Sequence, residues 1–187
     1  SSKVPAILVV HENRGLNPHI EDVARRVALE NFVALAPDAL FPLGGYPGDE
    51  DRARALFQKL EQPKAFEDMV AATEYLRAQP GVLKRLGVVG FCYGGSIANR
   101  LAVAVPELRA AVPFYGSAPP LENVGAIKAE LLLHFAQIDE RVNASWPAFE
   151  VALKAAGVTH TAHVYPGTQH GFHNDTTPRY DPEAAQL

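Results

Sequence analysis

The chain of 187 residues contains a single cysteine, Cys92, and its setting suits a nucleophile. It lies in the run 90–95, Gly-Phe-Cys-Tyr-Gly-Gly, which has the form G-x-C-x-G where the nucleophile elbow reads G-x-S-x-G. At such an elbow the flanking glycines let a strand and a helix approach closely. The amino end of the helix favours a thiolate and a neighbouring oxyanion. A lone cysteine is more often a buried core residue, but this setting predicts a nucleophile.

A nucleophile of this kind needs a base, and the base needs an acid that orients it. After an elbow the acid and the histidine follow in that order, each behind a later strand. Asp139 follows the predicted strand 131–136, and His170 lies in the loop 166–172 after the last predicted strand. Taken alone, each is equally well a turn aspartate or a solvated loop histidine. Their order and spacing together favour a triad with Cys92.

One group of residues resembles a metal site: His170, His173 and Asp175. A lone H-x-x-H in a loop is a weak zinc signature when no cysteine or glutamate cluster completes it. The pair His11-Glu12 likewise lacks the second histidine of H-E-x-x-H. We therefore expect neither a metal nor another cofactor.

The elements that must position these residues alternate between short apolar runs and amphipathic stretches. This pattern is typical of a mostly parallel sheet with helices on both faces. Six strands are predicted over 6–10, 32–36, 86–91, 110–115, 131–136 and 160–165. Helices are predicted after the cap Asn17-Pro18 and over 49–60, 63–78, 93–105 and 145–156. The stretch 37–48, rich in proline and glycine, predicts a long surface loop. We expect one α/β domain over residues 1–187, without repeat or linker.

Composition excludes several classes of partner. The net charge of −4 and the scattered basic residues leave no footprint for nucleic acid. The apolar runs fall far short of a membrane span. A single cysteine permits no internal disulfide and fits a reducing compartment, so we expect a cytoplasmic protein with a small-molecule substrate. The short turn 181–187 indicates a truncated chain, a frayed end, or an end covered by a second subunit in a homodimer.

Together the motifs resemble those of the dienelactone hydrolase family in the α/β-hydrolase superfamily, over nearly the whole chain. The matching stretches are 9–15, 36–38, 90–95, 115–116, the aspartate loop and 170–172. The resemblance implies the triad Cys92, His170 and Asp139, with Glu12 as a fourth member that holds or takes the thiol proton. In the strand order 2-1-3-4-5-6 of this fold, the strands before Glu12 and Cys92 are neighbours at the switch point.

The resemblance also implies a hydrolase of small esters or lactones, similar to carboxymethylenebutenolidase, that works through a thioester. The backbone N–H groups of Tyr93 and Asn13 would form the oxyanion hole. Characterised family members place an arginine four residues after the histidine to bind a substrate carboxylate, and here that position is Asn174. We expect substrate contacts from Arg52, Tyr115 and Asn174, and the alternative arginines are Arg14, Arg54 and Arg141.

Functions of another class stay open on the same fold. One is a non-catalytic binding protein or a thiol redox sensor that uses Cys92 as an oxidisable group. A single cysteine without a resolving partner argues against the sensor. Another is an inactive scaffold that only dimerises.

Overall fold

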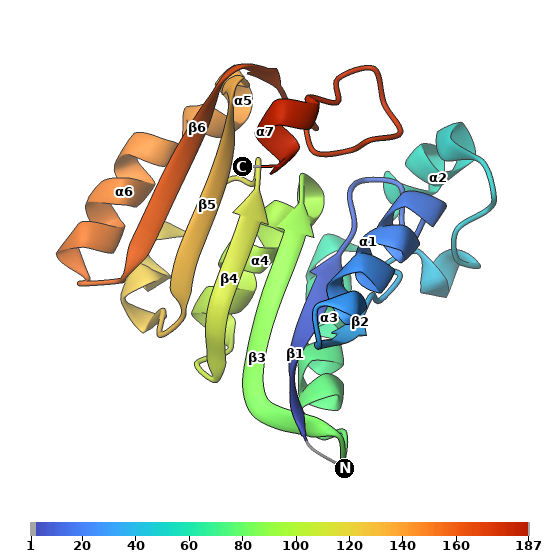
Figure 1. The fold of residues 1–187 in the computed structure, drawn as a ribbon, viewed down its shortest axis with the longest axis horizontal. Helices are drawn as coiled ribbons and strands as arrows, with labels where there is room; N and C mark the ends of the chain where they lie inside the picture. Colours follow the sequence, from blue (N-terminus) through green and yellow to red (C-terminus); the bar gives the residue numbers. More distant parts are fainter. Residues whose placement is uncertain (1–2, 187) are drawn as a thin grey trace.

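A single parallel sheet of six strands forms the centre of the molecule (Figure 1). The computed structural model describes residues 3–186. The strands run in the order β2-β1-β3-β4-β5-β6, as expected. Their bounds are β1 Val4–Val10, β2 Val33–Leu35, β3 Val82–Phe91, β4 Leu108–Phe114, β5 Glu130–Ile138 and β6 His160–Gln169. The switch point between β1 and β3 lies where the strand order reverses, and ligands of such sheets bind beyond the carboxyl ends of these strands.

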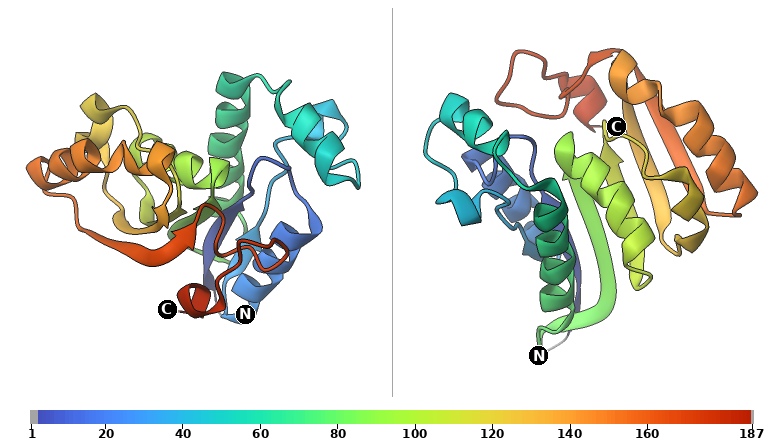
Figure 2. Two further views of the ribbon diagram at one scale, coloured as in Figure 1. Left: turned by 90° about the horizontal axis from the view of Figure 1, so that it is seen from above. Right: turned by 180° about the vertical axis from the view of Figure 1, so that it is seen from behind.

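The helices cover the two faces of the sheet unequally (Figure 2). One face carries three helices: α3 Gln62–Arg77, α4 Tyr93–Ala104 and α6 Trp146–Ala155. The other face, toward the viewer in Figure 1, carries α1 Pro18–Leu29 and the short α7 Pro182–Gln186. The connections hold α2 Glu50–Phe57, α5 Glu140–Asn143 and two 3₁₀ helices, Phe41–Leu43 and Leu121–Ala126.

Local chemistry explains where the main helices begin and end. The Asn17 side chain accepts a hydrogen bond from the Ile20 N–H at 3.0 Å, and Pro18 occupies the first turn, so α1 starts as predicted. Gly157 follows α6 with φ of 68°, the left-handed conformation expected after a helix. The predicted helix 49–60 is shorter, and α2 ends at Phe57.

Two strands extend further at their carboxyl ends than predicted, and this changes the setting of the candidate residues. β5 runs to Ile138 and β6 to Gln169, because these two residues pair beyond a register shift. Asp139 and His170 therefore follow directly on strand ends, rather than lying a few residues into loops. A side chain fixed to the end of a strand is positioned more rigidly than one in a mobile loop.

The core lies in two layers, one on each side of the sheet. The larger layer packs α3, α4 and α6 against the strands through buried side chains such as Met69, Leu101 and Phe149. The smaller layer packs α1 and the segment after His170 against the sheet, with Ile20 and Phe172 fully buried. This second layer includes the segment that directly follows His170, so its packing helps to fix the position of the candidate base.

A row of stacked rings crosses the smaller layer, one ring from each of four neighbouring strands. Phe91, Phe114, His134 and His163 are register partners in β3, β4, β5 and β6. Their ring centroids are 4.9, 4.2 and 5.9 Å apart in that order. His173 lies over the first two rings, at 5.1 and 4.9 Å. We call these five residues the ring row.

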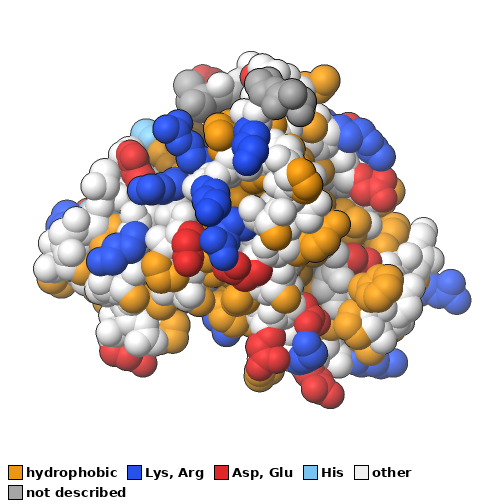
Figure 3. All heavy atoms as spheres, turned by 90° about the horizontal axis from the view of Figure 1, so that it is seen from below, with side chains coloured by type: hydrophobic (Ala, Val, Ile, Leu, Met, Phe, Trp, Pro, Cys, Tyr) orange, Lys and Arg blue, Asp and Glu red, His pale blue; other side chains and the backbone are white. Residues whose placement is uncertain are grey.

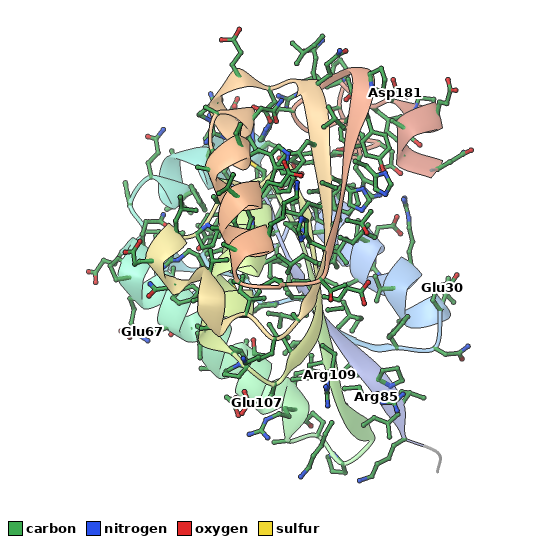
Figure 4. All side chains as sticks on the ribbon, turned by 90° about the vertical axis from the view of Figure 1, so that its left-hand side faces the viewer. Glu30, Glu67, Arg85, Glu107, Arg109 and Asp181 are labelled. Atoms are coloured by element: carbon green, nitrogen blue, oxygen red, sulfur yellow. The ribbon has the colours of Figure 1, made fainter. Side chains whose placement is uncertain are left out.

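Charged side chains lie at both ends of the sheet. Arg85 and Arg109 lie near the amino ends of the strands, whereas Asp181 lies at the opposite end (Figure 4). Seen from below, side chains of both charges are interspersed with apolar ones (Figure 3). Within residues 3–186, no helix is both long and apolar enough to cross a membrane.

Candidate active site

Cys92 occupies a strained turn between β3 and α4. Its backbone has φ of 58° and ψ of −113°, a conformation that costs free energy in a residue with a side chain. The turn is fixed by the Cys92 N–H, which donates to the carbonyl of Phe114 at 3.0 Å. A Cβ on Gly94 would lie 2.1 Å from the carbonyl oxygen of Val10, so only glycine fits where the helix meets β1. The sequence thus builds the elbow that the G-x-C-x-G pattern predicts.

His170 and Asp139 meet at the ends of β6 and β5. The Nδ1 atom of His170 is 2.5 Å from Oδ2 of Asp139, whose side chain is buried. An ionised aspartate can only accept, so Nδ1 carries the hydrogen and Nε2 is left as the acceptor. Tyr115 packs against the ring of His170, with centroids 4.9 Å apart. This tautomer is the one that a general base requires.

The Cys92 thiol is protonated in the free protein. Burial raises its pKa to about 11, and the Glu12 carboxylate adds to the rise. The backbone N–H of Tyr93, at the amino end of α4, lowers the pKa, as does the guanidinium of Arg141. The helix end therefore acts in the predicted direction, but loss of solvation outweighs it.

Glu12 lies beside the switch point, two residues beyond the end of β1. β1 pairs with β3, and Val10 at the end of β1 is the register partner of Gly90. The Oε1 atom of Glu12 accepts a hydrogen bond from Nδ2 of Asn174 at 2.7 Å. The carboxylate is thus held at the wall of the same cleft that Cys92 lines.

His11, in contrast, is part of the support beneath the site. It is fully buried, and its Nε2 accepts the N–H of Ala39 at 3.0 Å, while Nδ1 contacts the carbonyl of Glu12 at 2.5 Å. Burial lowers its pKa, so the ring is neutral and ties the end of β1 to the loop after β2. This arrangement holds the backbone on which Glu12 sits.

A cleft of about 700 Å³ opens over these residues, and polar and charged side chains dominate its wall. Cys92, His170, Glu12, Asn13 and Asn174 all line it. Four arginines contribute to the wall: Arg14, Arg54, Arg141 and Arg179.

Two of the expected substrate contacts lie elsewhere. Arg52 is exposed in the first turn of α2, where its N–H donates to the side chain of Asp49, and it does not line the cleft. The neighbouring Arg54 lines it instead, because residues two apart point to different sides of a helix. Tyr115 is 1% exposed and lies behind His170 rather than in the cleft. The structure therefore does not bring these two residues to the cleft wall.

The sequence reasoning missed several residues of the cleft wall, among them Arg179 and Thr176. Both lie in the irregular segment between β6 and α7, which has no periodicity from which a direction could be read. The possible metal group is dispersed: Asp175 pairs with Arg26 at 2.7 Å, and His173 packs in the ring row. Among residues 3–186 no cluster of three metal-ligating side chains occurs.

A parallel six-stranded sheet of this order, with a nucleophile elbow after β3, defines the α/β-hydrolase class. Within that class, the chain belongs to the dienelactone hydrolase family, whose model matches residues 1–187. The family and the names of its relatives make the chain a hydrolase of the ester or lactone type.

Relatives match the chain along nearly its whole length. A Synechocystis sp. protein named "Putative carboxymethylenebutenolidase" is 32% identical over 97% of this chain and 80% of its own. A Bradyrhizobium sp. protein named "Probable 2-oxo-3-(5-oxofuran-2-ylidene)propanoate lactonase" is 30% identical over 100% and 80%. A Klebsiella pneumoniae crystal structure named "Putative Dienelactone Hydrolase" has a TM-score of 0.86, at 28% identity, over 100% of this chain and 83% of that one.

Proposed function

We propose that the chain hydrolyses a small ester or lactone with Cys92 as nucleophile, His170 as general base and acid, and Asp139 as the group that orients the histidine. One observation carries the proposal above the others. His170 is held by Asp139 at 2.5 Å in the tautomer of a base, in the same cleft as a cysteine on a strained elbow. Acyl transfer requires a nucleophile, a base and an orienting acid, and here these groups follow the ends of β3, β6 and β5.

Activation of Cys92 is the first step. With a thiol pKa of about 11, a negligible fraction of thiolate exists at neutral pH before substrate binds. Glu12, the carboxylate in the cleft that raises this pKa, takes the thiol proton when the substrate enters and water leaves. The resting protein is therefore protected from oxidation and alkylation, and the substrate itself promotes the reactive form.

The chemistry then runs in two halves. The Cys92 sulfur attacks the acyl carbon, and the oxyanion accepts hydrogen bonds from the N–H groups of Tyr93 and Asn13. The thiol proton passes from Glu12 to Nε2 of His170, and the bond to the leaving oxygen breaks as His170 delivers that proton to it, which leaves a thioester. In the second half His170 removes a proton from water, the hydroxide attacks the thioester, and Cys92 departs as a thiolate. A thiolate leaves readily, so activated esters and enol lactones are better substrates than amides.

The arginines of the cleft favour a substrate with an anionic group. Arg14 is 3.8 Å from Glu50 and is neutralised in part. Within residues 3–186, Arg54, Arg141 and Arg179 have no carboxylate at ion-pair distance, although all three line the cleft. Guanidinium groups bind carboxylates in a bidentate fashion. We propose that these three, rather than Arg52, take the place of the arginine that position 174 lacks.

A hydrolysis screen tests the proposal. Wild type, Cys92→Ala and Cys92→Ser are assayed on p-nitrophenyl esters and on neutral and carboxylate-bearing lactones. Cys92→Ala is expected to lower kcat/KM by about 10³-fold or more, since the covalent route is lost. Unchanged melting temperatures serve as the control for folding. Full activity in Cys92→Ala, or wild-type protein that is oxidised by peroxide yet turns over no ester, would reject the triad.

A further inference from the structure

We propose that Asn174 is a positioning residue that holds the Glu12 carboxylate beside Cys92 without neutralising its charge. This inference rests on the proposed function, because it concerns how the resting state of that nucleophile is set. Nothing about substrate contact is required of Asn174. Its amide is directed at the protein's own carboxylate.

The hydrogen bonds of Asn174 leave only one orientation for its amide. The Oδ1 atom accepts the backbone N–H of Thr176 at 3.0 Å and its hydroxyl at 2.6 Å. Since both partners donate, the atom facing them is the oxygen, and the amide nitrogen must point to the other side. There Nδ2 donates to Oε1 of Glu12 at 2.7 Å. Asn174 is 5% exposed, so solvent does not compete for these bonds.

The backbone of Asn174 is anchored on both sides. Its N–H donates to the carbonyl of Gly171 at 3.0 Å, directly after the candidate base. The next residue, Asp175, pairs with Arg26 of α1 at 2.7 Å and lies 3.3 Å from Nδ1 of His19. The segment is therefore tied to α1 as well as to β6, and it holds the amide at a fixed distance from the end of β1.

A neutral donor has a consequence that a cationic one would not have. An amide orients a carboxylate and leaves its full negative charge, whereas a guanidinium forms an ion pair and cancels most of the field. Glu12 raises the pKa of the Cys92 thiol, while Arg141 lowers it and Asp139 raises it slightly. His170 faces the same cleft. Of these groups, only Glu12 is held by Asn174, so the effect of Asn174 on the thiol must pass through Glu12.

Alkylation of the thiol tests this directly, because the chain has one cysteine and iodoacetamide therefore reports on Cys92 alone. The rate is measured against pH for wild type, Asn174→Ala, Glu12→Gln and the double variant. Removing the amide lets Glu12 turn into water, where its charge is screened. Asn174→Ala is therefore expected to alkylate about threefold to tenfold faster near pH 8, with its pH profile shifted to lower pH. Glu12→Gln shifts the profile the same way, and the double variant matches Glu12→Gln.

Two further variants complete the experiment. Thr176→Val removes the hydroxyl that fixes the amide and keeps Asn174, so a smaller shift in the same direction is expected even if Asn174→Ala folds poorly. Asn123→Ala, the same substitution in the 3₁₀ helix far from the cleft, is expected to leave the profile unchanged. Thermal melts establish that each variant is folded.

The outcomes separate this inference from the proposed function. A wild-type profile in both Asn174→Ala and Thr176→Val, or shifts from Asn174→Ala and Glu12→Gln that add in the double variant, would overturn the positioning role. Neither result affects the triad. Retention of full hydrolysis by Cys92→Ala would reject the triad. The alkylation profile of Cys92 would still test the positioning role of Asn174, because alkylation is measured without substrate turnover.

Discussion

The cleft and the ring row both contain histidines from the β5–β6 side of the sheet, His170 directly after β6 and His134 on β5, but the two regions give them different partners. In the cleft, His170 is paired with a buried carboxylate, Asp139. In the ring row, His134 contacts the Tyr165 hydroxyl at 2.8 Å and is stacked on Phe114. Burial and the neighbouring His163 and His173 lower the pKa of His134 to about 4. A histidine without a carboxylate stays neutral there and serves packing, whereas Asp139 fixes the Nδ1–H tautomer of His170.

The largest loss of activity is expected when the carboxylate partner of His170 is removed. Asp139→Asn keeps the shape but presents an amide to Nδ1, so the tautomer and the stabilisation of the imidazolium are lost. We expect kcat/KM on an activated ester to fall by about 10³- to 10⁴-fold. His134→Phe, which keeps a stacked ring, is the matched control and is expected to retain activity close to wild type. Equal losses of kcat/KM in the two variants would mean that the carboxylate partner does not give His170 a catalytic role that His134 lacks.

The next effect concerns the stability of the ring row. Phe91 is 2% exposed and stacks on Phe114 and His173. Phe91→Ala is expected to lower the free energy of unfolding by about 3–5 kcal/mol, from lost burial and the cavity left behind. Leu132→Ala on the same sheet is the control, because Leu132 is 37% exposed and should cost under about 1 kcal/mol. Urea denaturation gives both values, and similar costs would show that the row is not a packed unit.

The pH dependence of stability should follow the buried histidines, namely those of the ring row together with His11 beneath the cleft. Burial lowers the pKa values of His134 and His173 to about 4, below the value near 6.5 of the unfolded chain. Between these values the unfolded chain binds more protons. This contribution is therefore complete above about pH 6.5 and is lost as the pH falls toward 4. We expect a loss of about 1–2 kcal/mol per histidine, after allowing for partial solvent screening.

Thermal melts between pH 7 and 4 measure this decline. His134→Phe is expected to make the decline shallower, because one of the titrating histidines is gone while His173 and the buried His11 remain. His160→Phe, at the start of β6 and outside the ring row, serves as the control. A decline of unchanged steepness in His134→Phe would assign the pH dependence to other groups.

The smallest effect is expected at the link between the two regions. Arg26 of α1 pairs with Asp175, which lies between His173 of the ring row and the cleft segment. Arg26 is 52% exposed, so Arg26→Ala is expected to cost under about 1 kcal/mol. Arg25→Ala, which breaks only the exposed pair with Glu21, should cost less still. A loss of several kcal/mol for Arg26→Ala would show that the two regions unfold as one unit through this pair.

The sequence alone determined the fold and the elbow. Alternating apolar runs and helical stretches predicted six strands, because local periodicity reports which face of each element is buried. The strand order followed from the family resemblance and agrees with the structure. The glycines around Cys92 predicted the elbow, since only residues without a Cβ fit such a turn. The family resemblance to the dienelactone hydrolases was confirmed by the match over residues 1–187.

The tertiary structure alone decided the electrostatics and the wall of the cleft. The helix end suggested a reactive thiolate, yet burial and Glu12 hold Cys92 as a thiol, and burial is a property of the whole packed molecule. Arg52 was expected in the cleft, but helix phase turns Arg54 inward instead. The contact between Glu12 and Asn174 joins residues 162 positions apart. Local sequence patterns do not encode such a contact, because it forms only when the segment after β6 packs against the end of β1 in the folded molecule.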